Sequence, residues 1–201
     1  MGFEFIAGDL SLDFINTFDP PAGPVPPSDS LHSYRDLVDW AAGAGVISAS
    51  QRASRLRLAK ENPQAAETSF RQAVQFRGSL HRLVLALMEH RSPASEDLRR
   101  FNAFLSHAQA QVQLHAAPEG YSLQLVNDPQ QPGSLLWPIA SAASRLLTSG
   151  DAQFIRRCDA ESCRWFFVDR SKNHSRRWCD MKVCGNRAKA RKFYRQRKNA
   201  D

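Results

Sequence analysis

The chain has 201 residues, of which 42% are hydrophobic, enough for one ordinary domain with a packed core and a small second module. It contains no run of about 18 uncharged apolar residues, which a membrane-spanning helix would need. Its first 18 residues carry acids where a secretory signal would carry basic residues. We therefore expect neither membrane insertion nor export, and a cytoplasmic location.

The charge of +7 is distributed very unevenly along the chain. Residues 1–150 contain 12 Lys and Arg against 14 Asp and Glu, a net charge of −2, whereas residues 151–201 contain 15 against 6, a net charge of +9. A positive field confined to one segment favours a polyanion, and nucleic acid is the commonest polyanion in a cell. A membrane surface or ribosomal RNA would satisfy the same field, so charge alone does not choose among them.

The first 150 residues predict a mostly helical domain with a little antiparallel sheet. In chain order, we expect a strand at residues 3–6, a helix at 10–18, a proline-rich surface loop at 19–30, helices at about 33–44, 50–60, 65–91 and 93–105, strands at 111–115 and 121–126, and a helix at 135–148. The helix at 65–91 is the longest and should be central to the core. In the next helix we expect Leu98, Phe101, Phe104 and Leu105 to be buried. The fold class is α+β, and Gly150 marks the predicted domain boundary, with 1–150 a sensing or dimerising domain and 151–201 a separately folding module.

All four cysteines of the chain lie in this second module. Their spacing is Cys158-x4-Cys163, then fifteen residues, then Cys179-x4-Cys184. Two short loops that each offer a pair of thiolates can enclose one zinc ion, whose size and geometry suit four sulfur ligands. Such a closed site leaves no position for water or substrate, so the expected zinc is structural.

Two alternatives to this zinc site are four unrelated buried thiols or two disulfides, but clustered, evenly paired cysteines favour a metal. His174 could replace one cysteine as a ligand, although its polar surroundings favour a solvated loop. Between the cysteine pairs, alternating residues at 164–169 predict a small hairpin. Because the last two ligands directly precede a helix, we expect a treble-clef-like finger.

The cysteine segment closely resembles the CGNR zinc finger. The motif consists of Cys158-x4-Cys163-x-Trp165-x-Phe167-x-Asp169, then Asn173, then Arg176-Arg177-Trp178-Cys179-x-Met181-x-x-Cys184-Gly185-Asn186-Arg187. In that bacterial family the finger follows an N-terminal domain called ABATE, of stress-induced transcription regulators. The run 10–17 resembles the opening signature of that domain, with Ile15 where valine is usual, and 37–40 with Gly45 resembles its next block. The resemblance implies zinc binding, DNA binding and gene regulation.

Residues 185–198 form a basic helix with seven Lys or Arg in fourteen positions. Its apolar side, with Ala190, Phe193 and Tyr194, is expected to pack on the aromatic residues of the finger, and its basic side to meet phosphates. The candidate DNA-binding residues are Asn186, Arg187, Lys189, Arg191, Lys192, Arg195 and Lys198. Asn186 and Arg187 are residue types that read base edges, but Asn186 could instead cap the helix and Arg187 could bond the finger.

The N-terminal domain offers a weaker functional signal. Asp13, Asn16, Asp39 and Arg77 could line a polar effector pocket, although helix caps and an internal salt link would explain the same residues. No glycine-rich phosphate loop, nucleophile elbow or histidine pair at metal spacing occurs, so we expect no enzyme.

The sequence therefore predicts a zinc-dependent DNA-binding transcription regulator. The alternative is an RNA- or ribosome-associated zinc-binding protein that recognises shape and phosphate. The expected partners are duplex DNA, a small-molecule effector and a second copy in a homodimer, with no membrane.

Overall fold

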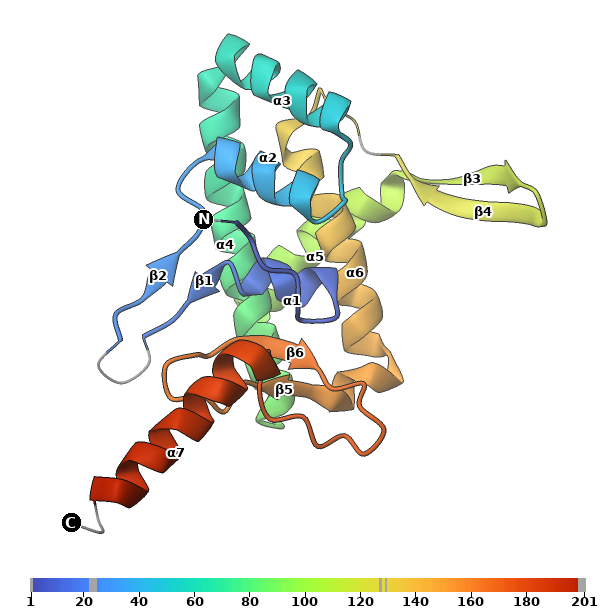
Figure 1. The fold of residues 1–201 in the computed structure, drawn as a ribbon. Coiled ribbons are helices and arrows are strands. Elements are labelled where there is room, and N and C mark those ends of the chain that lie inside the picture. The colour runs from blue at the N-terminus through green and yellow to red at the C-terminus, as the bar shows by residue number, and fades with distance from the viewer. Residues whose placement is uncertain (1, 22–24, 127, 129, 199–201) are drawn as a thin grey trace.

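The computed structural model describes residues 2–21, 25–126, 128 and 130–198, and the side chains of all of these except 192–196 and 198. A body of helices carries three small two-stranded antiparallel sheets, and the cysteine module packs against one end of it (Figure 1). The helices are α1 (Leu10–Ile15), α2 (Tyr34–Gly43), α3 (Ala49–Glu61), α4 (Pro63–Met88), α5 (Ser95–Ala110), α6 (Leu136–Thr148) and α7 (Asn186–Lys198), with shorter turns η1 (Pro132–Leu135), η2 (Gly150–Phe154) and η3 (Met181–Gly185). The strands pair as β1 (Phe18–Asp19) with β2 (Ser28–Asp29), β3 (Val112–Ala117) with β4 (Gly120–Leu125), and β5 (Ile155–Arg157) with β6 (Phe166–Val168).

Local sequence signals set where the long helices begin. Ser48 and Gln51 form a capping box at the start of α3, in which each side chain bonds the backbone N–H of the other residue. The side chain of Asn62 then accepts a hydrogen bond from the N–H of Ala65, and Pro63 occupies the first position of α4. Proline is favoured there because its missing N–H would have no partner in the helix. The sequence thus separates α3 from α4 without a loop.

The core is built around α4, as expected, and aromatic rings fill it. Phe14 of α1 lies with its ring centroid 5.2 Å from that of Trp40, and Phe76 of α4 stacks on Phe101 of α5 at 6.0 Å. Trp40 and Phe76 are fully buried. Large apolar side chains of this kind contribute most of the burial free energy of a small domain.

A buried arginine fixes the segment that leads into α6. Arg55 of α3 is 1% exposed, and its guanidinium donates to Ser134 Oγ at 2.7 Å and to the carbonyl oxygens of Asp128 and Gln131 at 3.2 Å. Because burying an unpaired cation would be costly, these acceptors are what allow Arg55 to lie inside the fold.

The second of the three small sheets, β3 with β4, is a hairpin that stands away from the helical body. In Figure 1, β3 and β4 project beyond the end of α5. Their register pairs Val112 with Leu125 and Ala117 with Gly120, so the turn is the two residues Pro118 and Glu119, shorter than the loop expected from the sequence. Proline has φ fixed at about −65° and so suits the first position of this turn, and Gly120 follows it with a φ of +125° that glycine adopts most easily.

Three sequence expectations for the first domain are wrong in detail. Residues 3–6 form no strand; the apolar segment instead lies against α2 and the finger, and Phe5 packs on Trp40. The first helix ends at Ile15, and Phe18 begins a two-residue strand that pairs across the proline-rich segment. Leu98 is 41% exposed, because the buried side of α5 turns toward Phe101 instead.

The finger and the helical body share one continuous core. The side chain of Asn16 donates to the carbonyl of Phe166 and accepts from its N–H, both at 2.8 Å, as a neighbouring strand would. The N–H of Val168 donates to the carbonyl of Ala7 at 2.8 Å. Strand β6 is therefore held on one side by β5 and on the other by the first domain.

Among the described helices, none combines the length and the apolar composition needed to cross a membrane.

Candidate metal centre and nucleic-acid interface

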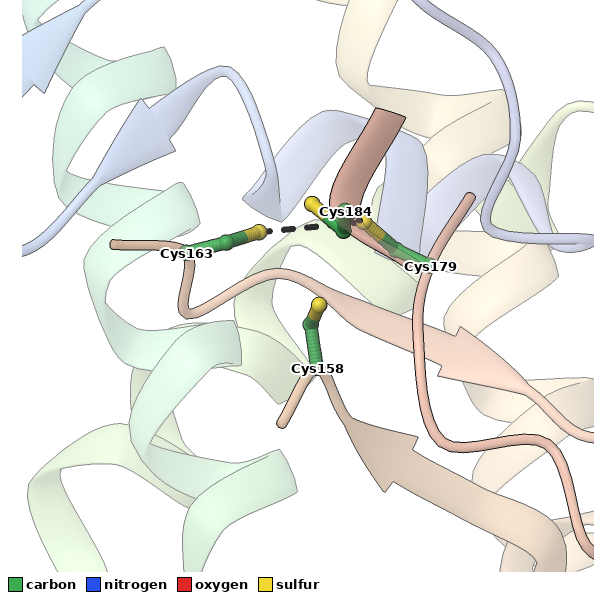
Figure 2. Close-up of side chains that lie close together, drawn as sticks. All are labelled: Cys158, Cys163, Cys179 and Cys184. Atoms are coloured by element: carbon green, nitrogen blue, oxygen red, sulfur yellow. Dashed lines mark hydrogen bonds between the residues drawn. The ribbon is translucent and has the colours of Figure 1, made fainter. Parts of the chain in front are cut away.

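The four cysteine sulfurs converge on one point, as Figure 2 shows. All four Sγ atoms lie within 4.8 Å of one another, and all four side chains are buried. The Sγ atoms of Cys163 and Cys179 are 3.7 Å apart, as are those of Cys179 and Cys184. These separations exclude disulfides, whose sulfurs are bonded at about 2.05 Å.

The sulfur geometry fits a tetrahedral zinc ion. With Zn–S bonds of about 2.3 Å, ideal tetrahedral geometry places sulfurs about 3.8 Å apart, close to the spacing observed. Four thiolate donors also suit zinc better than a hard cation such as magnesium. The metal site predicted from the cysteine spacing is thus assembled by the fold, and zinc is the ion it fits best.

The thiols compete for charge when no cation is present. Hydrogen bonding from Cys163 and Cys179 lowers the pKa of the Cys158 thiol, whereas hydrogen bonding with Cys158 raises the pKa of both other thiols. Burial and the nearby charge of Cys158 raise the pKa of Cys184. Without a cation, the fold thus stabilises the thiolate of Cys158 and disfavours the thiolates of the other three cysteines. A divalent cation would stabilise all four thiolates together.

Two backbone features present the cysteine pairs. Cys158 follows β5, and Cys163 lies in the short loop before β6, where the N–H of Cys158 donates to the carbonyl of Trp165 at 2.9 Å. On the other side, the carboxylate of Asp180 accepts from the N–H groups of Lys182 and Val183 and so caps the turn that carries Cys184. A hairpin pair and a helix-start pair around one metal is the treble-clef-like arrangement expected from the sequence.

Asp169 and Arg176 organise the loop between the cysteine pairs, a role that the sequence did not reveal. The fully buried Asp169 carboxylate accepts from the N–H groups of Ser171 and Arg176 and from the Ser171 hydroxyl. The Arg176 guanidinium stacks on Phe167 at 4.4 Å and donates to the carbonyls of Trp178 and Cys179. Both residues belong to the motif and orient the backbone of a metal ligand without touching the site.

His174 is not a ligand of this centre. Its ring stacks on Phe154 with centroids 3.7 Å apart, and Nδ1 lies 2.8 Å from the carbonyl oxygen of Asp169. The residue is exposed on the loop, in agreement with the loop interpretation.

Helix α7 leaves the finger and extends away from the rest of the molecule (Figure 1). Asn186 is exposed and already helical, with φ −67° and ψ −38°, while Asp180 caps the preceding turn, so the N-cap interpretation of Asn186 is wrong. Ala190 is exposed as well, and the expected packing of this position on the finger's aromatic residues is not seen.

Two of the candidate basic residues contact the loop between Cys158 and Cys163. Arg187 donates to Ser162 Oγ at 3.0 Å, a bond to the finger of the kind that the sequence allowed, and Arg191 pairs with Glu161 at 3.0 Å. Both side chains remain partly or largely open to solvent, and Lys189 is exposed. The side chains of Lys192, Arg195 and Lys198, like those of Phe193 and Tyr194, lie outside the described part of the structure.

The four candidate effector residues do not converge on one pocket. Asp39 forms an ion pair with Arg52 of α3, and Asn16 is occupied by Phe166. Arg77 makes a bidentate ion pair with Asp29 and also donates to Thr17.

Asp13 is likewise used inside the fold. Its buried carboxylate accepts from the N–H of Ala7 at 2.9 Å. Burial raises the pKa of this carboxyl to about 6, although backbone hydrogen bonds from Ala7 and Ile6 oppose the shift. All four residues thus have partners within the fold: Asp39 and Arg77 form salt links, as the alternative interpretation expected, but none of the four side chains caps a helix.

A cavity that none of these four residues lines lies between α4, α5 and the segment before α6. Its volume is about 540 Å³, and Phe104, Trp137 and Pro132 form its apolar part. Its polar part is lined by Gln72, Gln75, Arg100, His107, Gln130, Gln131 and Ser134. None of the described lining residues is acidic, so the cavity suits a small ligand with hydrogen-bond acceptors. No periodicity or motif in the sequence points to this cavity, since its glutamines lie partly on α4 and partly in the segment before α6.

Comparison with known proteins assigns both parts of the chain. Residues 8–150 match the ABATE family model, described as a putative stress-induced transcription regulator, and residues 155–198 match the CGNR zinc finger model. No curated protein matches the chain. Because the first match covers well over half of the residues and the second accounts for the cysteine site, the chain belongs to the ABATE family and carries a CGNR zinc finger.

Proposed function

We propose that the protein is a zinc-dependent DNA-binding transcription regulator that acts in a bacterial stress response. The observation that carries the proposal is the concentration of charge, because the finger segment has a net charge of +9 and ends in a helix that stands clear of the body. The family description supports the regulatory part. The closed four-sulfur site supports a structural role for the metal, and we propose no enzymatic activity.

The form of α7 suits a duplex. An isolated helix about as wide as the major groove can enter it, whereas a helix packed along the body could not. Arg187 and Arg191 are held by Ser162 and Glu161 in exposed interactions, which contribute little net free energy in water. A phosphate can therefore replace these partners at small cost, and the same contacts keep both guanidinium groups near the start of the helix.

A salt titration of binding tests this proposal. If about four to six phosphates are neutralised, the logarithm of the affinity should fall with that of the salt concentration at a slope of about −4 to −5. Arg191→Ala should weaken binding to all sequences alike and reduce the slope by about one, whereas Arg187→Ala should cost about 1–3 kcal/mol at the preferred site and relax preference there. Arg99→Ala, an exposed arginine of α5, is the matched control and should change neither quantity.

Comparison of nucleic acids decides between the proposed function and its alternative. Binding should be measured to duplex DNA, single-stranded RNA and double-stranded RNA over the same salt range. Preference for a duplex DNA sequence supports the regulator. Equal or tighter binding to RNA, with no sequence preference on DNA, would replace it with the RNA- or ribosome-associated function.

The sensing part of the proposal rests on the 540 Å³ cavity. Its aromatic floor and its amide, imidazole and guanidinium groups suit an aromatic carboxylate, with the ring on Phe104 and the carboxylate near Arg100. We expect benzoate or salicylate to raise the melting temperature of the zinc-bound protein, and neutral benzamide to do so less. Arg100→Gln should remove the difference between the acid and the amide.

Arg99→Gln provides the control for the cavity experiment. Arg99 and Arg100 both form ion pairs with Glu96, but only Arg100 lines the cavity. The sensing proposal fails if the aromatic acids bind equally well to both variants or do not bind the wild-type protein at millimolar concentration.

A further inference from the structure

The projecting hairpin has one entirely apolar face. Because neighbouring residues in a strand point to opposite faces, the observed register divides the hairpin cleanly. The apolar face consists of Val112, Leu114, Ala116, Tyr121, Leu123 and Leu125. The opposite face consists of Gln113, His115, Ala117, Gly120, Ser122 and Gln124. The pattern is that of a sheet with one buried side.

That apolar face is uncovered in the isolated chain. Leu114 is 63% exposed, Leu123 72% and Tyr121 78%, and only the rung nearest the body, Val112 with Leu125, is half-buried. A single two-stranded hairpin is marginally stable in water, and a contiguous exposed apolar patch of this kind marks an interaction site. An apolar face stabilises a hairpin only when another surface covers it, so we expect a binding partner here.

We propose that the apolar face is covered by the same face of a second copy of the chain. With the two-fold axis at the central rung, Leu114 meets Leu114 of the second copy and Leu123 meets Leu123. The hairpins then run in opposite directions, so that Tyr121 at the tip of one covers Leu125 near the base of the other. A two-fold contact of this type closes on itself and gives a dimer, not a filament.

Charge argues against nucleic acid and an anionic membrane as occupants of this surface. The sequence contains no Lys or Arg between residues 101 and 144, so the hairpin lacks the cations that nucleic acid or an anionic lipid surface would need. The charged residue of the hairpin, Glu119, lies in the turn. An identical uncharged face matches this surface without repulsion. The inference is independent of what α7 binds, because the hairpin and α7 project from different sides of the body (Figure 1).

The size of the face sets the expected strength of the dimer. Three rungs give six apolar side chains from each copy, fewer than the roughly 20–30 residues per side of a standard interface, so we expect a weak dimer with a dissociation constant on the order of 10–100 µM. Sedimentation velocity of the full-length, zinc-loaded protein from about 1 to 200 µM should therefore show a reversible shift from monomer to dimer.

A charge exchange at position 123 tests the arrangement itself. Leu123→Glu and Leu123→Lys should each weaken dimerisation at least tenfold, because like charges then face each other across the two-fold axis. Mixing the two variants should restore a dimer, since Glu then faces Lys. Gln124→Glu, on the opposite face of the same strand, is the control and should dimerise like the wild-type protein. Zinc content and circular dichroism verify that the variants fold, as expected for a side chain that is already exposed.

Four results would overturn the proposal. The wild-type protein could remain monomeric at 200 µM, or Leu123→Glu could leave the dimer unchanged, which would place any dimer contact elsewhere. A mixture of the two charge variants that stays monomeric would show that position 123 does not face itself. Binding of the monomer to neutral phosphatidylcholine vesicles, lost in Leu123→Glu, would identify a lipid occupant instead.

Discussion

At the scale of single residues, Asn16 shows how a polar side chain can replace a strand. Its amide presents a donor and an acceptor at the spacing of a backbone peptide, and both are used by Phe166 of β6. The edge of a two-stranded sheet leaves such backbone groups unpaired, and a buried unpaired group would cost about 1–3 kcal/mol. Asn16 therefore makes the finger's sheet edge compatible with burial.

Because Asp13 is buried, we expect it to make the protein less stable as the pH rises, the opposite of the effect of a carboxylate that is ion-paired in the folded state. Because burial raises the pKa of its carboxyl from its ordinary value near 4 to about 6, the folded state prefers the protonated form. The stability due to this preference is complete below about pH 4 and is lost as the pH rises through about 6, at a cost of up to about 2–3 kcal/mol. Asp13→Asn, which retains an acceptor for the Ala7 N–H, should remove this loss.

Urea unfolding of both proteins between pH 4 and pH 7 measures the Asp13 effect. The difference in free energy of unfolding, variant minus wild type, should become more positive across this range, and taking the difference cancels the acid sensitivity of the zinc site. A difference that is constant with pH would mean that Asp13 titrates normally in the folded protein.

At the scale of elements, the finger supports α1. Strand β6 contacts α1 through Asn16, so loss of the metal should loosen the helical domain as well as the finger. This differs from the sequence expectation that residues 1–150 fold independently of the finger.

Hydrogen exchange tests this coupling. Chelation of zinc, or Cys184→Ser, should accelerate amide exchange in α1, whereas α3 at the far end of the body should be much less affected (Figure 1). Asn16→Ala with zinc bound should reproduce the effect in α1 while the finger keeps its metal. Exchange changes confined to residues 155–198 after chelation would restore the independent-domain interpretation.

The elements differ in how well the sequence predicts them. Helices α3 and α4 are predictable because their periodicity and their caps at Ser48 and Asn62 are local signals. The zinc ligands are predictable because metal chemistry restricts both residue type and spacing. Residues 3–6 mislead because an apolar extended segment resembles a strand, but the Ile6 carbonyl accepts from the side chain of Arg176 and not from a neighbouring strand. Likewise, periodicity reports that α5 has an apolar side and not that Leu98 remains at its exposed margin.

At the scale of the whole molecule, residues 7–16 contact residues 166–170 of the finger. The carbonyl of Gly8, a glycine with φ of +79°, accepts from Arg170 at 2.6 Å, and the carbonyl of Ala7 accepts from Val168. Asn16 and Phe166 are separated by 150 positions. These contacts explain why the finger is part of the body although its sequence motif is self-contained.

This contact between the first helix and the finger has a consequence for synthesis in the cell. A ribosome adds about 5–20 residues per second, so α1 leaves the exit tunnel roughly ten to thirty seconds before the strand that completes its surroundings. During that interval Leu12, Phe14 and Ile15, which end fully buried, have no finished site to enter. The nascent chain must therefore keep these apolar side chains uncovered until residues 155–168 have been translated, so the folding of α1 waits for the finger.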